Sequence, residues 1–90
     1  MTMSMQERRV SVLVQFLKLN NNRQFLLDEL RVELNTKLPS LYRFNNNNNL
    51  VHLFIFLPKF GLRLEPIINT IKLNTSKSKK IKYYKAFLKN

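Results

Sequence analysis

The first half of the chain alternates apolar and polar positions with the period of an α-helix. Between residues 6 and 19, apolar positions recur at intervals of three and four: Val10, Leu13, Val14 and Leu17. This spacing predicts a helix with a wide apolar side. A comparable pattern from Arg23 to Asn35 predicts a second helix, with Phe25 and Val32 opposite its leucine stripe. The asparagines at positions 20–22 separate the two segments, so we expect a helical hairpin.

The next part of the chain fits two patterns. Asn45–Asn49 is expected to be a loop, because asparagine side chains compete for their own backbone groups. Residues 50–57 are almost continuously apolar, which is typical of a buried strand, although they also show helical spacing. We favour a strand because the run is rich in aromatic and β-branched residues. A turn at Pro58–Gly61 and alternating residues from 62 to 73 would complete a β-hairpin.

The last part of the chain is basic. If Thr75 or Ser76 caps a helix that begins near Lys77, then Ile81, Tyr84 and Leu88 share one side of it. The lysines at positions 82, 85 and 89 share another side. This segment is therefore predicted to be a basic amphipathic helix.

These elements predict a small single domain of the α+β class, with two N-terminal helices, a β-hairpin and a basic C-terminal helix. The core would occupy residues 1–75, and the basic amphipathic helix or tail would occupy residues 76–90. The alternative is a winged helix-turn-helix. It follows if residues 50–57 are helical and residues 61–73 form the wing.

Composition argues against catalysis. A chain of 90 residues with 44% hydrophobic residues makes one globular domain. It has no cysteine, which excludes disulfides and thiolate metal sites, and its single glycine excludes the phosphate-binding loops. His52 has no ligand companions, and Glu29 and Glu33 have the spacing of ordinary charges on a helix surface. We therefore expect no enzymatic activity, no metal and no cofactor.

The distribution of charge indicates a partner. The net charge is +11, and the residues from Pro66 to Asn90 include seven lysines and no acid. Such a segment predicts contact with a polyanion. The arginines are scattered, and we interpret most of them as structural or general surface charges. The candidate nucleic-acid-binding residues are Lys77, Lys79, Lys80, Lys82, Tyr83, Lys85, Lys89, Arg43 and Arg63.

We therefore expect a non-enzymatic nucleic-acid-binding protein in which lysines contact phosphates and Tyr83 stacks on a base or contacts sugar. RNA is favoured over DNA, in a small ribonucleoprotein or a ribosome-type component. A winged-helix DNA-binding protein is the alternative within the same class. The expected setting is intracellular, either mitochondrial or nuclear, but the sequence does not identify the compartment.

Other kinds of partner are also open. The chain could be an assembly subunit that binds a protein or itself through apolar helix faces, including Phe25 and Val32. A basic amphipathic segment could also lie on an anionic membrane surface. No apolar run reaches the ~20 residues that a transmembrane helix needs. Abundant Asn, Lys, Ile and Phe with few Gly and Ala indicate an A/T-rich gene, so a recently arisen reading frame without a defined activity is a further alternative.

Overall fold

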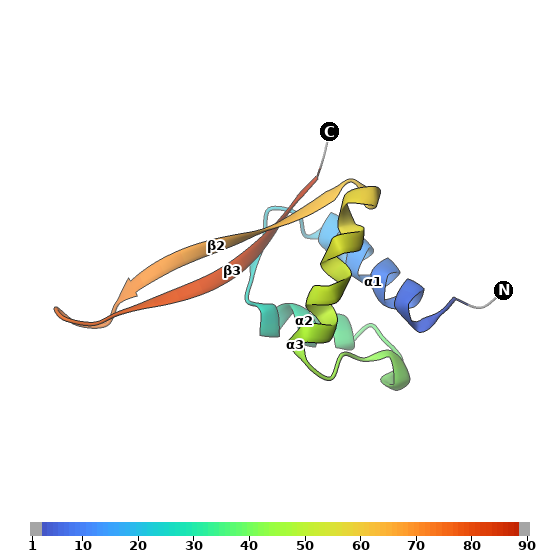
Figure 1. Ribbon diagram of the computed structural model, residues 1–90, viewed down its shortest axis with the longest axis horizontal. Helices are drawn as coiled ribbons and strands as arrows, with labels where there is room; N and C mark the ends of the chain where they lie inside the picture. Colours follow the sequence, from blue (N-terminus) through green and yellow to red (C-terminus); the bar gives the residue numbers. More distant parts are fainter. Residues whose placement is uncertain (1–2, 89–90) are drawn as a thin grey trace.

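A computed structural model describes residues 3–88 of the chain. Within this range, three helices pack at one end of a three-stranded antiparallel sheet, so the domain is α+β as predicted (Figure 1). In chain order the elements are α1 (Met5–Leu19), β1 (Gln24–Phe25), α2 (Leu27–Asn35), η1 (Ser40–Tyr42), α3 (Asn47–Val51), η2 (His52–Phe60), β2 (Leu62–Lys72) and β3 (Ser78–Leu88).

The helix predicted from residues 6–19 is confirmed as α1. It begins with a capping box, in which the Ser4 hydroxyl accepts a hydrogen bond from the Glu7 backbone N–H at 3.1 Å. The Glu7 carboxylate in turn accepts one from the Ser4 N–H at 3.3 Å. These two bonds satisfy backbone donors that a helix start would otherwise leave unpaired.

The second helix begins later than its apolar pattern predicts. Residues 24–25 form the short strand β1, and α2 starts at Leu27. Phe25 is therefore not on the back of a helix. It is fully buried, and its ring packs against that of Phe16 with the centroids 5.3 Å apart. The expectation that Phe25 lies on a partner-facing surface is wrong.

Residues 47–60 are helical, so the strand favoured for residues 50–57 is wrong. α3 runs directly into the 3₁₀ segment η2, and we call the two together the third helix. The spacing of Leu50, Leu53 and Leu57 explains the outcome, because all three are buried on one side of it. The segment ends at Gly61, whose φ of 73° is the left-handed conformation that glycine adopts without steric cost.

The asparagine run is also more ordered than the expected loop. The Asn46 side chain caps α3 by accepting a hydrogen bond from the Asn49 N–H at 3.0 Å. Asn47 connects the third helix to α2: its Nδ2 donates to Asp28 Oδ1 at 2.7 Å, and its Oδ1 accepts from Arg31 Nε at 2.8 Å. The run therefore fixes the contact between two helices.

The predicted basic C-terminal helix is wrong, because residues 78–88 form the strand β3. β3 pairs antiparallel with β2 from Leu62↔Leu88 to Lys72↔Ser78, and β1 pairs with its other side through Phe25↔Tyr84. The sheet order is β1-β3-β2, which makes β3 the central strand. The expected boundary after residue 75 falls in the turn of this hairpin.

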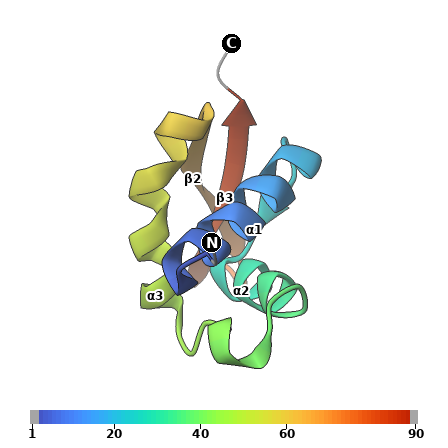
Figure 2. The same cartoon turned by 90° about the vertical axis from the view of Figure 1, so that its right-hand side faces the viewer.

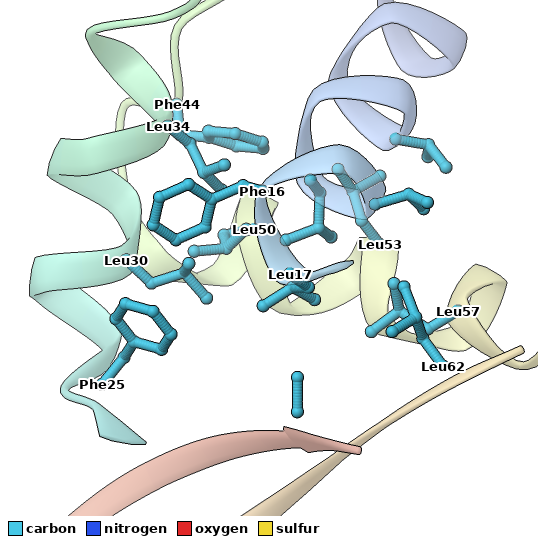
Figure 3. Packing of buried hydrophobic residues seen from close by; sticks show 14 of the residues in the cluster. Phe16, Leu17, Phe25, Leu30, Leu34, Phe44, Leu50, Leu53, Leu57 and Leu62 are labelled. Carbon is cyan, nitrogen blue, oxygen red and sulfur yellow. The ribbon is translucent and has the colours of Figure 1, made fainter. Parts of the chain in front are cut away.

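The hydrophobic core lies between the helices and the base of the hairpin (Figure 3). Viewed along the long axis, α1 lies in front of the sheet with α2 and α3 on either side (Figure 2). Leu62 and Ala86 close the core from the sheet side. The fully or almost fully buried leucines are Leu13, Leu17, Leu30, Leu34, Leu50, Leu57 and Leu62.

The hairpin extends well beyond this core. The radius of gyration is 14.9 Å and the longest dimension is 59 Å, whereas a compact chain of this length would have a radius of gyration of about 12 Å. Every residue from Ile68 to Lys80 is exposed. Among residues 3–88, none of the helices has the length and apolar character required to cross a membrane.

Candidate nucleic-acid interface

The turn of the hairpin is held by a single side chain. Asn74 Oδ1 accepts hydrogen bonds from the backbone N–H of Ser76 at 2.9 Å and of Lys77 at 2.8 Å. The Leu73 N–H donates to the Lys77 carbonyl oxygen at 3.0 Å, which closes the end of the ladder. Asparagine is suited to this role because its amide replaces a backbone acceptor in a turn. Lys77 is thereby placed at the far end of the molecule.

Strand geometry divides the predicted lysines between two faces of the hairpin. Leu62 and Ala86 are buried under the helices, so the even-numbered residues of both strands form the helix-side face and the odd-numbered residues form the outer face. Lys80 and Lys82 belong to the helix-side face. Lys79 and Lys85 belong to the outer face. The helical grouping of Lys82 with Lys85 is therefore wrong.

The hairpin lysines are not neutralised by carboxylates. Within residues 3–88, the salt bridges are Arg31–Asp28 at 3.7 Å and Arg63–Glu65 at 2.8 Å. Glu65 is the only acidic residue of β2 and β3, and it lies near the base of the hairpin. The positive charge of the hairpin therefore remains available to an external anion.

A continuous set of contacts joins Lys82, on the helix-side face, to the third helix. The rings of Phe54 and Tyr84 meet edge to face with their centroids 5.7 Å apart. The ammonium of Lys82 lies 5.2 Å from the centroid of the same tyrosine ring. Because Tyr84 contacts both residues, the helix-side face of the hairpin and the third helix form adjoining parts of one surface.

The outer face has a different arrangement. The Arg63 guanidinium and the Lys85 ammonium both lie 5.4 Å from the centroid of the Phe87 ring. Arg63 also pairs with Glu65, so its charge is already used within the chain. Tyr83 is half-buried on this face, opposite Ile67 in the register. Tyr83 therefore lies with Lys79 and Lys85, not with Lys80 and Lys82.

One of the predicted site residues, Arg43, lies away from the hairpin. Arg43 directly follows η1, and the green segment that contains η1 lies across the helices from the hairpin turn (Figure 1). The Arg43 Nε donates to the Leu38 carbonyl oxygen at 3.3 Å. Lys89 lies outside the described residues. The structure thus brings together lysines 77, 79, 80, 82 and 85 with Tyr83 on the hairpin, and it separates Arg43 from them.

The other well-placed arginines support the body of the domain. The Arg9 side chain donates to the carbonyl oxygens of Tyr42 at 2.7 Å and Arg43 at 2.8 Å. Its guanidinium also lies 4.7 Å from the centroid of the Phe44 ring. Arginine suits this position because its planar group can donate several hydrogen bonds while it stacks on a ring. This agrees with the interpretation of the scattered arginines as structural.

The sequence analysis missed the exposed side of the third helix. Pro58 and Phe60 are exposed near the end of this segment, and a longer row of exposed residues recurs at intervals of three and four: Asn48, Val51, His52, Ile55 and Lys59. Lys59 is the only residue of the row that carries a formal charge. The signal was present in the helical spacing of residues 50–57, but the strand interpretation assigned these residues to other faces.

Across residues 3–88, the His, Asp and Glu side chains form no group of three that could hold a metal ion. Comparisons of the chain with protein-family models, with curated proteins and with solved structures found no match.

Proposed function

We propose that this chain is a winged-helix domain that binds duplex DNA and has no catalytic activity. The observation that carries the proposal is a basic hairpin projecting beside the third helix, with lysines that have no carboxylate partner among residues 3–88. The order helix, strand, helix, helix, strand, strand is the order expected of such a domain. The sheet order β1-β3-β2 also supports it, because the last two strands form the wing.

In this proposal α2 and the third helix act as a helix-turn-helix. The second helix of such a pair lies in the major groove, and its first residues contact base edges. The connection between them, residues 36–46, is longer than the usual turn of three or four residues. Arg9 and Asn47 would compensate for that length, because Arg9 binds the connection and Asn47 binds α2.

The hairpin would contact the phosphate backbone next to this groove. Lys80 and Lys82 lie on the face that adjoins the third helix, and Lys77 lies in the turn. Each neutralised phosphate releases counterions, so duplex affinity should fall as salt rises. In a plot of log affinity against log salt concentration, every phosphate contacted should make the slope more negative by about 0.9. Contacts of this kind position a protein on DNA without selecting a sequence.

RNA, which the sequence favoured, uses a different face in this arrangement. The major groove of an RNA duplex is too deep and narrow for a helix, so RNA recognition would depend on single strands and stacking. Tyr83, the aromatic residue that the sequence indicated for stacking, shares the outer face with Lys79 and Lys85. The two faces of the hairpin therefore distinguish the two ligands.

The test compares two double variants with the same change in net charge. K80Q/K82Q alters the helix-side face and K79Q/K85Q alters the outer face, and both are measured against duplex DNA and single-stranded RNA over a salt series. A truncation before Lys77 would be uninformative, because it removes the central strand β3. Thermal unfolding of each variant checks that the fold is retained.

We expect K80Q/K82Q to weaken duplex binding and to lower the salt slope by about 1.8, the value for two phosphates. K79Q/K85Q should retain duplex binding nearly unchanged. If the outer-face variant alone loses binding, and the affected ligand is single-stranded RNA, the domain binds RNA and the winged-helix proposal is wrong. Binding that neither variant affects would contradict any role for the hairpin.

A further inference from the structure

The row on the exposed side of the third helix is chemically unusual for a surface beside a basic hairpin. Ile55 is 76% exposed and Val51 is 36% exposed, although both lie in the middle of the segment. Asn48 precedes them at helical spacing and is also exposed. The row therefore presents the Asn48 amide, two aliphatic groups with the His52 imidazole between them, and Lys59 at its far end.

The row adjoins the helix-side face of the hairpin. Phe54, which contacts Tyr84 of β3, is three residues from Val51 and next to Ile55 along the third helix. Lys82 lies against the other partner of this contact, Tyr84. Only the Phe54–Tyr84 pair separates Lys82 from the row. A polyanion bound by Lys82 would therefore lie next to the row.

Among the five asparagines of the run, Asn48 is the one suited to an external ligand. The amide of Asn46 caps the helix, and the amide of Asn47 binds Asp28 and Arg31. Asn49 is half-buried, and Asn45 precedes the cap. The Asn48 side chain is exposed and forms no hydrogen bond with the rest of residues 3–88.

The amide and the two aliphatic groups of the row each match a base edge in the major groove. An asparagine amide pairs with N6 and N7 of adenine, and aliphatic groups contact the C5-methyl group of thymine. Guanine is usually bound by arginine or lysine through O6 and N7. Lys59 is the only such residue in the row, at its far end, and its ammonium lies 5.4 Å from the centroid of the Phe56 ring.

We propose that the third helix selects A·T base pairs, with Asn48 binding adenine and Val51 and Ile55 contacting thymine methyl groups. This inference rests on the proposed function, because it requires the third helix to enter the major groove of DNA. It adds sequence preference to a hairpin that supplies affinity without it. A protein ligand on the same aliphatic row is the competing possibility, and the experiment separates the two.

The experiment uses the full chain and three duplexes of equal length: one rich in A·T pairs, the same duplex with deoxyuridine in place of thymidine, and one rich in G·C pairs. Deoxyuridine removes only the C5-methyl group and keeps every hydrogen-bonding group of the base. Affinities are measured over a salt series for the wild type and for I55A, N48A and V32A, and the three duplexes are compared at equal salt. Val32 is an exposed valine on α2, outside the row, so V32A is the matched control.

The wild type and V32A should bind the thymidine duplex roughly three- to fivefold more tightly than the deoxyuridine duplex for each methyl contacted, as for burial of one CH₂. I55A should reduce this ratio, since it removes one of the aliphatic contacts. N48A should lower the preference for A·T over G·C by about 5- to 150-fold, the range for one bidentate base contact.

Several results would overturn the inference. Equal binding of the thymidine and deoxyuridine duplexes by the wild type would do so, and so would a ratio that I55A leaves unchanged. If binding still falls steeply with salt in either case, the proposed function stands and only the base preference is wrong. If DNA binding is absent or independent of salt, the proposed function itself fails, and the aliphatic row is then assigned to a protein partner.

Discussion

The helical body and the hairpin use positive charge in different ways. In the body, the side chains of Arg9, Arg31 and Arg43 donate hydrogen bonds to oxygen atoms of the same chain. In the hairpin beyond its base, the positive charges are lysines, and none of those in residues 72–85 has a carboxylate partner within the described chain. Arginine provides a rigid fork for fixed contacts, whereas lysine is a flexible point charge. The comparison indicates that arginine builds this domain and lysine is available to a ligand.

The two regions also differ in what stabilises them. The body buries leucines from three helices in one core. The hairpin beyond Pro66 has one strand pair, a turn held by Asn74 and two largely exposed faces. Substitutions in the body should therefore change stability, and substitutions in the hairpin should change binding. The following predictions test this separation.

The largest effect on stability is expected from L17A. Leu17 is fully buried at the centre of the core, and truncation of such a leucine costs about 2–5 kcal/mol. That is a large part of the ~5–15 kcal/mol by which a whole domain is stable. Denaturant titration measures the loss. A cost below that of an exposed leucine, for example in L41A, would show that the core is not packed as described.

N47A should have an intermediate effect. It removes two hydrogen bonds between α2 and the third helix and leaves Asp28 and Arg31 without that partner. We expect a loss of about 1–3 kcal/mol in the free energy of unfolding. N48A is the matched control, because the side chain of Asn48, next to Asn47, forms no hydrogen bond with the rest of residues 3–88. If both variants are equally stable, Asn47 does not fix the helix contact.

G61A should have a smaller effect, at the junction of the two regions. Its φ is 73°, and a Cβ added there would meet nothing within 4 Å. The cost is therefore conformational only, about 1 kcal/mol. Thermal unfolding with duplex-binding measurements on the same variant would test this. A loss several times larger would indicate that the added methyl group displaces the hairpin relative to the third helix.

The smallest effect on stability is expected for K79Q and K80Q. These two variants test most directly whether the hairpin affects binding and not stability. The two lysines are adjacent and exposed, and they differ in the face of β3 to which they belong. Each should change the free energy of unfolding by less than about 0.5 kcal/mol. K80Q should weaken duplex DNA binding more than K79Q does. Equal losses would show that the face of the hairpin does not matter.

The sequence predicted those features that depend on local pattern. The periodic leucines and valines of α1 were sufficient, because one wide apolar side is compatible only with a helix there. Residues 50–57 satisfied both periods, and only burial of Leu50, Leu53 and Leu57 against the other helices selects the helical one. The element order of both candidate folds, the α+β hairpin fold and the winged helix-turn-helix, was therefore available from the sequence. The sequence could not decide between these two folds.

The candidate site was predicted only in part for a related reason. The absence of carboxylates after Glu65 could be seen in the sequence, and it explains why the lysines lack ion pairs. Their grouping could not be seen, because Ile81, Tyr84 and Leu88 match a helical face by coincidence. Pairing with β2 decides that segment, and such a partner is distant in the sequence. The face that each lysine occupies follows from this pairing alone.

The position of β3 also determines when the domain can form during synthesis. β1 and β2 both pair with β3, and β3 is the last of the described elements to be made. β1 has no neighbour until Tyr84 and Lys85 have left the ribosome, and β2 is fully paired only once Leu88 follows. Phe25 must then close a long loop to reach Tyr84. Until that moment the nascent helices expose leucines that chaperones recognise. A chain truncated inside the hairpin should accordingly fail to fold and be degraded by proteases.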